Sequence, residues 1–433
     1  MKRLAVLLAA SAAMPATAQT VAVVGGTVAI GDGSQPIPNG TVVFRDGRVV
    51  AAGANVPTPA GATVVNAAGK WVVAGTVAGW TDLGLADAGY GVQESNDVAA
   101  RTAAFGAAID VSTSINPAAV AIGNERLGGV TRAVVAPGAN ASIFGGQGAV
   151  IDLGADPDPV TRARAFQLVE MGERGAEIAG GSRPAAFAAL TDALAQAEDF
   201  RRDRRGFDGR GTDALLKRAD AQALLDVLDG RTRLMVHAER ASDIRAVLAL
   251  PRTYPKLKLI LLGATEGWML AREIAAARVP VIAAALADLP ASFEQLAATE
   301  SNVGRLQAAG VVVAISTVGA NTAPGEHILH QYAGNLVAIG KVPGATGLSW
   351  GQAFATITSR PAEALGIDGE IGSLRPGRRA DVVIWSGDPL ELSSTPEAIW
   401  IDGRPQPTNS RQRRLRDRYL QPTEGALPKA YER

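Results

Sequence analysis

Short apolar segments recur along the second half of the chain at a spacing that few folds accommodate. They begin roughly 20 to 30 residues apart, which is the spacing of repeated βα units. Each is followed by a stretch with helical periodicity, and the segments are residues 234–236, 257–262, 279–284 and 311–315. Apolar runs of this length are typical of strands buried on both faces of a parallel sheet. The pattern predicts a barrel of alternating strands and helices, with 71–77 as a first strand and 133–135 as another.

Both ends of the chain have a different, β-rich rhythm. Residues 21–73 alternate short apolar segments with turns such as Asp46-Gly47, and residues 380–385 and 398–403 repeat this style near the other end. We therefore expect the two ends to build one small sheet domain beside the barrel. The predicted division is a signal peptide at 1–18, the first part of the sheet domain at 19–73, the barrel at 74–366, the second part of the sheet domain at 367–408, and a basic helix and tail at 409–433.

The N-terminus has the pattern of a secretory signal. Lys2 and Arg3 precede an apolar run at 4–14, and the sequence Ala-Thr-Ala at 16–18 supplies the small residues of a cleavage site. An apolar run this short cannot cross roughly 30 Å of hydrocarbon. We expect cleavage after Ala18, a periplasmic or secreted protein, and no membrane span.

Composition excludes several classes of function. The chain has 42 acidic and 42 basic side chains, so it has no charge excess to attract a nucleic acid. It contains no cysteine, which excludes disulfides, thiolate metal sites and a cysteine nucleophile. A glycine-rich stretch at 143–148 is not followed by Gly-Lys-Ser/Thr, so we interpret it as a loop at the barrel mouth and not as a phosphate-binding loop.

Four motifs spread over the chain carry a resemblance to a known family. They are the segments 40–53, 69–75, 128–131 with the following loop at 137–148, and 372–385. Together they resemble the amidohydrolase superfamily, in particular its exported imidazolonepropionase-like members. The resemblance implies an α/β fold, a (β/α)8 TIM barrel with a composite β-sandwich domain built from both chain ends. It also implies hydrolysis of amides or cyclic amides by one or two divalent metals at the barrel mouth.

The resemblance places the family's metal-ligand positions on particular residues. Trp80 and Asp82 stand at the His-x-His pair after the first strand, where an indole cannot ligate a metal but a carboxylate can. His237 keeps the histidine after the fifth strand. Gly263 and Val318 stand where a histidine and an aspartate would act, and neither offers a side-chain donor. Only Asp82 and His237 remain as metal-ligand remnants.

Other polar residues near the expected mouth complete the candidate set. Glu173 is the candidate for the carboxylate after the fourth strand, and Glu239 could either face the mouth or pair with an arginine. His327 and His330 are three residues apart on one helix face. They lack the glutamate of the His-Glu-x-x-His motif, so we expect a surface or interface pair.

Catalytic zinc needs three protein ligands, and two remnants do not provide them. The leading hypothesis is therefore a non-catalytic homologue, a pseudoenzyme, with no catalytic residue and no cofactor, or at most weakly bound zinc or another divalent metal. It would act as a subunit of a homo- or hetero-oligomer, with an active amidohydrolase homologue as one possible partner, or as a ligand-binding relative. The alternative is a metal-dependent hydrolase of non-peptide C–N bonds with a site rearranged around Asp82, His237 and Glu173 or Glu239. A third hypothesis is a binding protein in which Trp80 stacks on a ligand.

Overall fold

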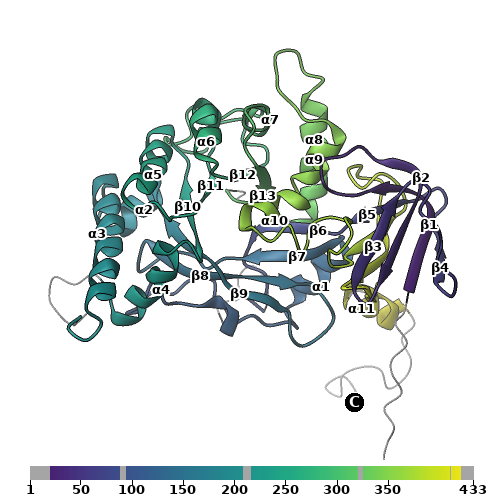
Figure 1. The fold of residues 1–433 in the computed structure, drawn as a ribbon, viewed down its shortest axis with the longest axis horizontal. Helices are drawn as coiled ribbons and strands as arrows, with labels where there is room; N and C mark the ends of the chain where they lie inside the picture. The colour runs from purple at the N-terminus through teal and green to yellow at the C-terminus, as the bar shows by residue number, and fades with distance from the viewer. Residues whose placement is uncertain (1–19, 88–93, 208–215, 320–324, 410, 421–433) are drawn as a thin grey trace, which may run out of the picture.

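The computed structural model describes residues 20–87, 94–207, 216–319, 325–409 and 411–420. Two sheets lie side by side in it (Figure 1). The first sheet is an eight-stranded barrel, and consecutive strands are neighbours throughout. The barrel strands are β6 (Thr76–Thr81), β7 (Val130–Val135), β8 (Phe144–Asp152), β9 (Val160–Glu170), β10 (Arg233–Ala238), β11 (Leu259–Gly263), β12 (Val281–Ala284) and β13 (Val313–Ser316). Every residue of β7 and β11 is buried, as expected for strands covered on both faces.

Helices surround the barrel sheet on its outer side (Figure 1). The longest, α3, begins after Ser182, whose side chain accepts a hydrogen bond from the Ala185 amide, and Pro184 occupies its first turn. The α-helices are α1 (Val120–Leu127), α2 (Gly172–Ile178), α3 (Arg183–Arg202), α4 (Arg218–Leu228), α5 (Ala241–Thr253), α6 (Ala271–Ala277), α7 (Asn302–Ala308), α8 (Leu329–Ile339), α9 (Trp350–Ala355), α10 (Ser359–Leu365) and α11 (Arg411–Leu420), with short 3-10 helices η1 (Val111–Thr113), η2 (Gly267–Leu270) and η3 (Glu326–Ile328).

The second sheet contains strands from both ends of the chain. Its order is β16-β15-β14-β5-β1-β2-β3, and β4 pairs with β1. These strands are β1 (Thr20–Ala29), β2 (Ile37–Arg45), β3 (Arg48–Gly53), β4 (Thr63–Asn66), β5 (Trp71–Ala74), β14 (Val382–Trp385), β15 (Pro396–Ile401) and β16 (Arg404–Pro405). The predicted fold class, a barrel with a second sheet domain beside it, is confirmed.

The glycine-rich segment that we interpreted as a mouth loop is a buried strand. Residues 144–148 belong to β8, which runs antiparallel to both β7 and β9. A Cβ on Gly148 would lie 2.0 Å from the Phe166 ring on the neighbouring strand, so glycine is needed for the two strands to pair. The loop prediction for 143–148 is therefore wrong, because close packing and not a turn requires these glycines.

The predicted first strand at 71–77 is two strands in two different sheets. β5 pairs with β1 and β14 in the second sheet, whereas β6 pairs with β7 in the barrel. The chain crosses between the sheets at Gly75, where a Cβ would lie 2.2 Å from the Thr131 hydroxyl oxygen. Its amide donates to the carbonyl of Asp381, at 3.0 Å.

None of the helices in the described part of the chain combines the length and apolar character needed to cross a bilayer. The signal peptide predicted at 1–18 and residues 421–433 of the predicted tail lie outside the described residues.

One buried arginine joins the barrel to the second sheet. Arg132, on β7, is fully buried and forms a two-pronged ion pair with Asp381, at 2.7 and 2.9 Å. It also binds Asp402 at 2.8 Å and lies 3.6 Å from Asp152 of β8. Asp381 precedes β14 and Asp402 follows β15, so one guanidinium connects three segments.

We predict that Arg132→Met lowers the free energy of unfolding by about 3–5 kcal/mol, because it leaves buried carboxylates without their counter-charge. The matched control is Arg164→Met, since Arg164 also pairs with a carboxylate, Asp110, but its own side chain is 65% exposed. That change should cost about 1 kcal/mol or less. Urea denaturation of both variants checks this, and equal losses would contradict the role of Arg132.

Candidate functional site

At the carboxyl ends of β9 and β10, His237 lies between two carboxylates. Glu170 is the last residue of β9 and stands in register with His237. The His237 Nδ1 atom is 2.6 Å from Glu170 Oε1, and its Nε2 atom is 3.1 Å from Glu239 Oε1. The parallel pairing of the two strands thus brings Glu170 and His237 together, and the turn after β10 adds Glu239.

Backbone groups after β11 hold Glu239 in place. The Glu239 side chain is 5% exposed, and its Oε2 atom accepts a 2.8 Å hydrogen bond from the Thr265 amide. The chain reaches this position through two left-handed residues, Gly263 with φ 81° and Ala264 with φ 50°. The Glu266 amide also donates to the Glu239 carbonyl, at 3.0 Å.

These contacts decide the charges of the group. Burial alone would lower the pKa of His237, but Glu170 and Glu239 outweigh burial and raise that pKa well above its usual value. Burial would raise the pKa of Glu239, but hydrogen bonds from His237 and Thr265 lower it overall. Both shifts favour an imidazolium that donates one N–H to each carboxylate. In that state neither ring nitrogen has a lone pair available for an ion.

Gly263, at the position where the resemblance expects a histidine, borders this group directly. A Cβ on Gly263 would lie 2.4 Å from Glu239 Oε1 and 2.9 Å from His237 Cδ2. The carboxylate of Glu239 thus occupies the space that a side chain at position 263 would enter.

The other predicted residues lie in different surroundings. Trp80 is half-buried in β6 and packs against the same barrel-interior cluster as Val318, which is 5% exposed. The Trp80 indole nitrogen is buried without a hydrogen-bond partner in the described part of the chain. Asp82 follows β6 and is exposed, although the surrounding protein still desolvates its carboxyl enough to raise the pKa.

Glu173, the candidate for the fourth-strand carboxylate, lies on α2. Its side chain is 70% exposed and forms a 2.8 Å ion pair with Arg183. Glu170 instead contacts His237 from the end of β9, and the sequence reasoning missed it. The first half of β9 is exposed and only its end is buried, so no apolar run marked the strand beforehand.

A second carboxyl group that sequence reasoning missed is Glu326 in η3. It is 8% exposed, and its Oε1 atom accepts a 3.0 Å hydrogen bond from the Thr317 hydroxyl. Its Oε2 atom has no hydrogen-bond partner among the described residues. Burial raises the pKa of Glu326 to about 8, and the negative charges of Glu125 and Asp82 contribute to the increase.

His327 and His330 do not act as a pair. His327 Nδ1 lies 3.1 Å from Glu125. His330 is buried and lies 2.8 Å from the Thr76 hydroxyl through Nε2, and its ring centroid is 4.5 Å from that of Trp385. Burial lowers the pKa of His330 to about 3, so its ring is neutral. The expected surface position is wrong for His330, which packs between the barrel and the second sheet.

The described side chains do not form a group of metal ligands. Across the ranges that the structure describes, no three or more His, Asp and Glu side chains are grouped in a way that could hold an ion. His237 is the histidine that the resemblance keeps, and both of its nitrogens contact carboxylates. The described residues as arranged do not fit a catalytic zinc centre with three protein ligands.

We predict that Gly263→Ala costs more stability than Gly344→Ala, although both glycines have nearly the same φ, 81° and 83°. Nothing lies within 4 Å of a Cβ on Gly344, so that variant should lose only the roughly 1–2 kcal/mol of left-handed strain. Gly263→Ala should lose a further roughly 1–3 kcal/mol through its clash with Glu239. Thermal and urea unfolding measure both, and equal losses would mean that the turn is looser than described.

We also predict a pH-dependent contribution from Glu326. The folded state keeps the proton of this carboxyl up to about pH 8, whereas the unfolded chain releases it near the ordinary value of 4.5. Folding therefore takes up a proton between about pH 4.5 and pH 8. The stability that this carboxyl contributes is fully present below that range and is lost as the pH rises through it. The slope is about 1.4 kcal/mol per pH unit at most.

The measurement is the difference in unfolding free energy between the parent and Glu326→Gln at a series of pH values. This difference should change between pH 5 and pH 8, whereas it should stay constant for the control Glu177→Gln, whose side chain is 70% exposed. A constant difference for Glu326→Gln would show that this carboxyl ionises normally.

Solved structures share this fold. An amidohydrolase from Thermotoga maritima MSB8 superposes with a TM-score of 0.78 at 23% sequence identity, over 89% of this chain and 99% of that one. An adenosine deaminase from Xanthomonas campestris with bound zinc matches with a TM-score of 0.52 at 18% identity, over 92% of this chain and 98% of that one. At these identities the similarity establishes the fold.

The expectation of no cofactor is contradicted by these comparisons. The deaminase relative contains zinc, so relatives with this fold point to a metal cofactor. The expectation rested on Trp80, Gly263 and Val318, which replace ligands at the family's metal positions, and it set aside the metal that the resemblance itself implied. The arrangement of donors around His237 does not fit a catalytic zinc ion, whereas this structure with the same fold contains zinc.

Sequence comparisons give the family itself. An imidazolonepropionase from Maricaulis maris is 36% identical over 119 residues, which are 27% of this chain and 27% of that protein, so the match spans about a quarter of the relative's length. A model of the amidohydrolase family matches residues 184–406, just over half of the chain. The chain therefore belongs to the amidohydrolase family.

Proposed function

We propose that this amidohydrolase-family member is an exported, non-catalytic protein that serves as a subunit of an oligomer or as a ligand-binding relative of the active enzymes. The observation that carries the proposal is the arrangement of Glu170, His237 and Glu239. A hydrolytic metal needs open donor atoms and a position for the water that it activates. The two His237 nitrogens contact the two carboxylates, so this residue offers no open donor.

The other family positions support the same proposal. Trp80 packs into the barrel interior, Gly263 has no side chain, and Val318 is buried among apolar residues. None of the three offers an atom that could bind an ion or accept a proton from water. A general base contributes on the order of 10²–10⁴ in rate, so its loss alone would be severe.

The proposal concerns catalysis and not whether an ion binds. Asp82 keeps a carboxylate directly after β6, and a solved structure with this fold contains zinc. An ion that binds to this chain without turnover is compatible with a non-catalytic role.

Export and assembly rest on sequence alone. The pattern of charged, apolar and small residues at 1–18 supports export and cleavage after Ala18. The partner would be a second copy of this chain or an active homologue.

We predict that the chain, purified with zinc and manganese supplied, hydrolyses amides and cyclic amides no faster than the uncatalysed reaction. His237→Ala should then behave like the parent in the same assay, because no reaction passes through this residue. Release of amine or ammonia measures turnover, and circular dichroism verifies that each variant is folded. The control is His327→Ala, since His327 also pairs with a carboxylate but lies outside the group around His237.

A different outcome of this assay would favour a metal-dependent hydrolase of C–N bonds with a rearranged site. The observation in its favour is that Asp82 and Glu326, whose charges interact, both have raised pKa values. Perturbed carboxyls of this kind concentrate at functional sites. Saturable turnover that is lost in His237→Ala and Asp82→Asn, but kept in His327→Ala, would replace the non-catalytic proposal.

A further inference from the structure

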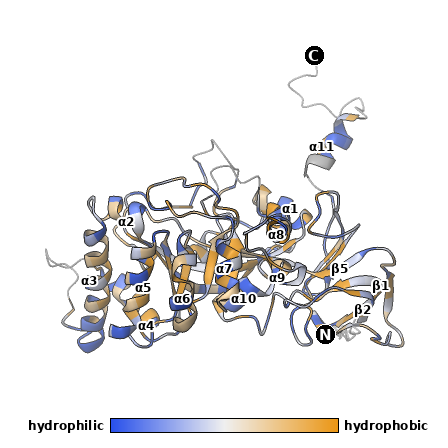
Figure 2. Ribbon diagram, turned by 90° about the horizontal axis from the view of Figure 1, so that it is seen from above, coloured by the Kyte–Doolittle hydropathy of each residue, from blue (hydrophilic) through white to orange (hydrophobic). Residues whose placement is uncertain are grey.

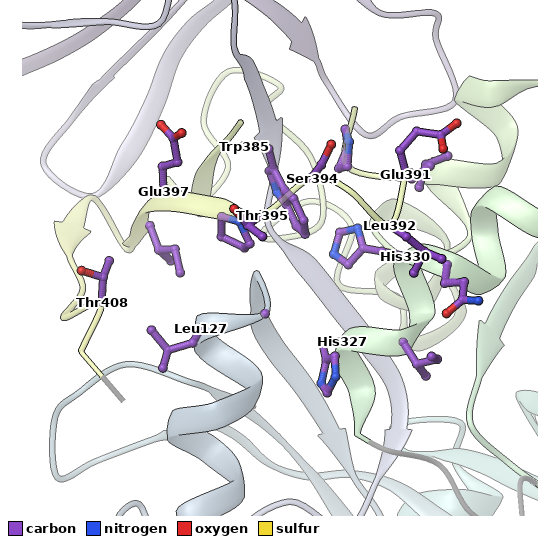
Figure 3. Close-up of a pocket in the computed structure, with 17 residues that line it drawn as sticks. Leu127, His327, His330, Trp385, Glu391, Leu392, Ser394, Thr395, Glu397 and Thr408 are labelled. Carbon is purple, nitrogen blue, oxygen red and sulfur yellow. The ribbon is translucent and has the colours of Figure 1, made fainter. Parts of the chain in front are cut away.

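A large cavity lies at the junction of the barrel and the second sheet (Figure 3), and its described lining does not include Glu170, His237 or Glu239. Its volume is about 810 Å³, and it is bordered by the end of α1, by η3 and α8, and by the segment 389–397. Leu127 and Ile328 contribute apolar walls, and Leu392 at its edge is 77% exposed.

The edge of this cavity also carries acidic groups. Glu391 and Glu397 both line it, and both are exposed. Glu397 additionally forms a 2.5 Å ion pair with Lys70. The cavity therefore combines apolar and polar walls with carboxylates at its edge, of which Glu397 already has a cation beside it.

Helix α11 has the complementary composition. Its ten residues include five arginines and one aspartate, so the helix is strongly basic. Leu415 and Tyr419 are four residues apart and share one face of the helix, with exposed fractions of 37% and 60%. Two apolar side chains flanked by arginines are suited to a groove that has apolar side chains on its walls and carboxylates at its edge.

The chain path places this helix next to the cavity. Thr408 lines the cavity, and α11 begins three residues later, at Arg411. Figure 2 nevertheless shows α11 standing apart from both domains, so its apolar stripe is not packed on its own body. Both the cavity and the stripe are therefore exposed in a single copy, although they are close in sequence.

We propose that α11 docks into the junction cavity of a second copy of this chain, and that two copies exchange their helices reciprocally. Such an exchange closes on itself with two-fold symmetry, so it produces a dimer and not an open chain. It buries Leu392 and the apolar side chains of α11, and it places arginines beside Glu391. Stable interfaces bury roughly 1,200–2,000 Å², and two helix contacts in each dimer come closer to that area than one.

The first test is the oligomeric state of the full chain by sedimentation equilibrium, which needs no substrate and is independent of the catalytic question. The parent should be a dimer. Leu392→Glu and Leu415→Glu should each raise the dimer dissociation constant at least about tenfold, because each buries a charge in the contact. The matched control is Leu289→Glu, which alters an equally exposed leucine, 78%, in the segment between β12 and α7. A monomeric parent, or a dimer that responds equally to all three changes, would overturn the proposal.

The second test uses the fact that the chain contains no cysteine. Copies with Leu392→Cys are mixed with copies with Leu415→Cys, and a short bismaleimide is added. The expected product is a cross-linked dimer that contains one copy of each variant. A variant that carries both Leu392→Cys and Leu415→Cys tests whether the helix docks into the cavity of its own chain. If this variant cross-links internally and stays monomeric, the exchange is overturned.

A basic amphipathic helix can also bind a membrane surface, and the design separates this possibility. Vesicles that contain phosphatidylglycerol are mixed with the parent and with Leu415→Glu. Vesicle binding through α11 by a chain that is otherwise monomeric would overturn the proposal. A dimer that does not bind these vesicles would support it.

Discussion

The ion cluster around Arg132 holds the two parts of the molecule in a fixed relation. One buried guanidinium binds carboxylates that come from β8, from the residue before β14 and from the turn after β15. Leaving Arg132 or Asp381 buried without its partner costs several kcal/mol, so the barrel and the second sheet cannot shift independently. The packing of His330 on Trp385 and the cavity beside these residues both lie at this junction and depend on it.

Buried carboxylates are compensated in three different ways in this chain. Asp381 pairs with Arg132, Glu239 pairs with His237, and Glu326 keeps its proton because burial and the negative charges of Glu125 and Asp82 raise its pKa. The second case is the most informative for function, because the cation beside these carboxylates is a side chain of the protein itself. A family that places divalent ions at the barrel mouth relies on the same attraction between carboxylates and positive charge. Here the group that the two carboxylates of Glu170 and Glu239 attract is the side chain of His237, whereas a solved structure with this fold contains zinc.

Sequence patterns predicted the fold class better than they predicted single residues. The rhythm of buried strands and helices, and the β-rich ends, were sufficient for the barrel and the second sheet, because both follow from where apolar surface must be buried. The antiparallel direction of β8 and the crossing at Gly75 were not predicted, since both depend on close approaches to Phe166 and Thr131 from other strands. Glu170 was missed for a related reason, because only the end of β9 is buried and no continuous apolar run precedes it.

The amino-acid sequence by itself determined which side chains are missing, since an indole, a glycine and a valine cannot become ligands in any fold. It also determined the periodicity from which the barrel follows. Only the tertiary structure decided that Glu170, His237 and Glu239 lie together and that Glu326 is buried beside the charges of Glu125 and Asp82. Contacts between residues far apart in the chain depend on strand register and helix packing, and pKa values depend on the burial that these contacts create.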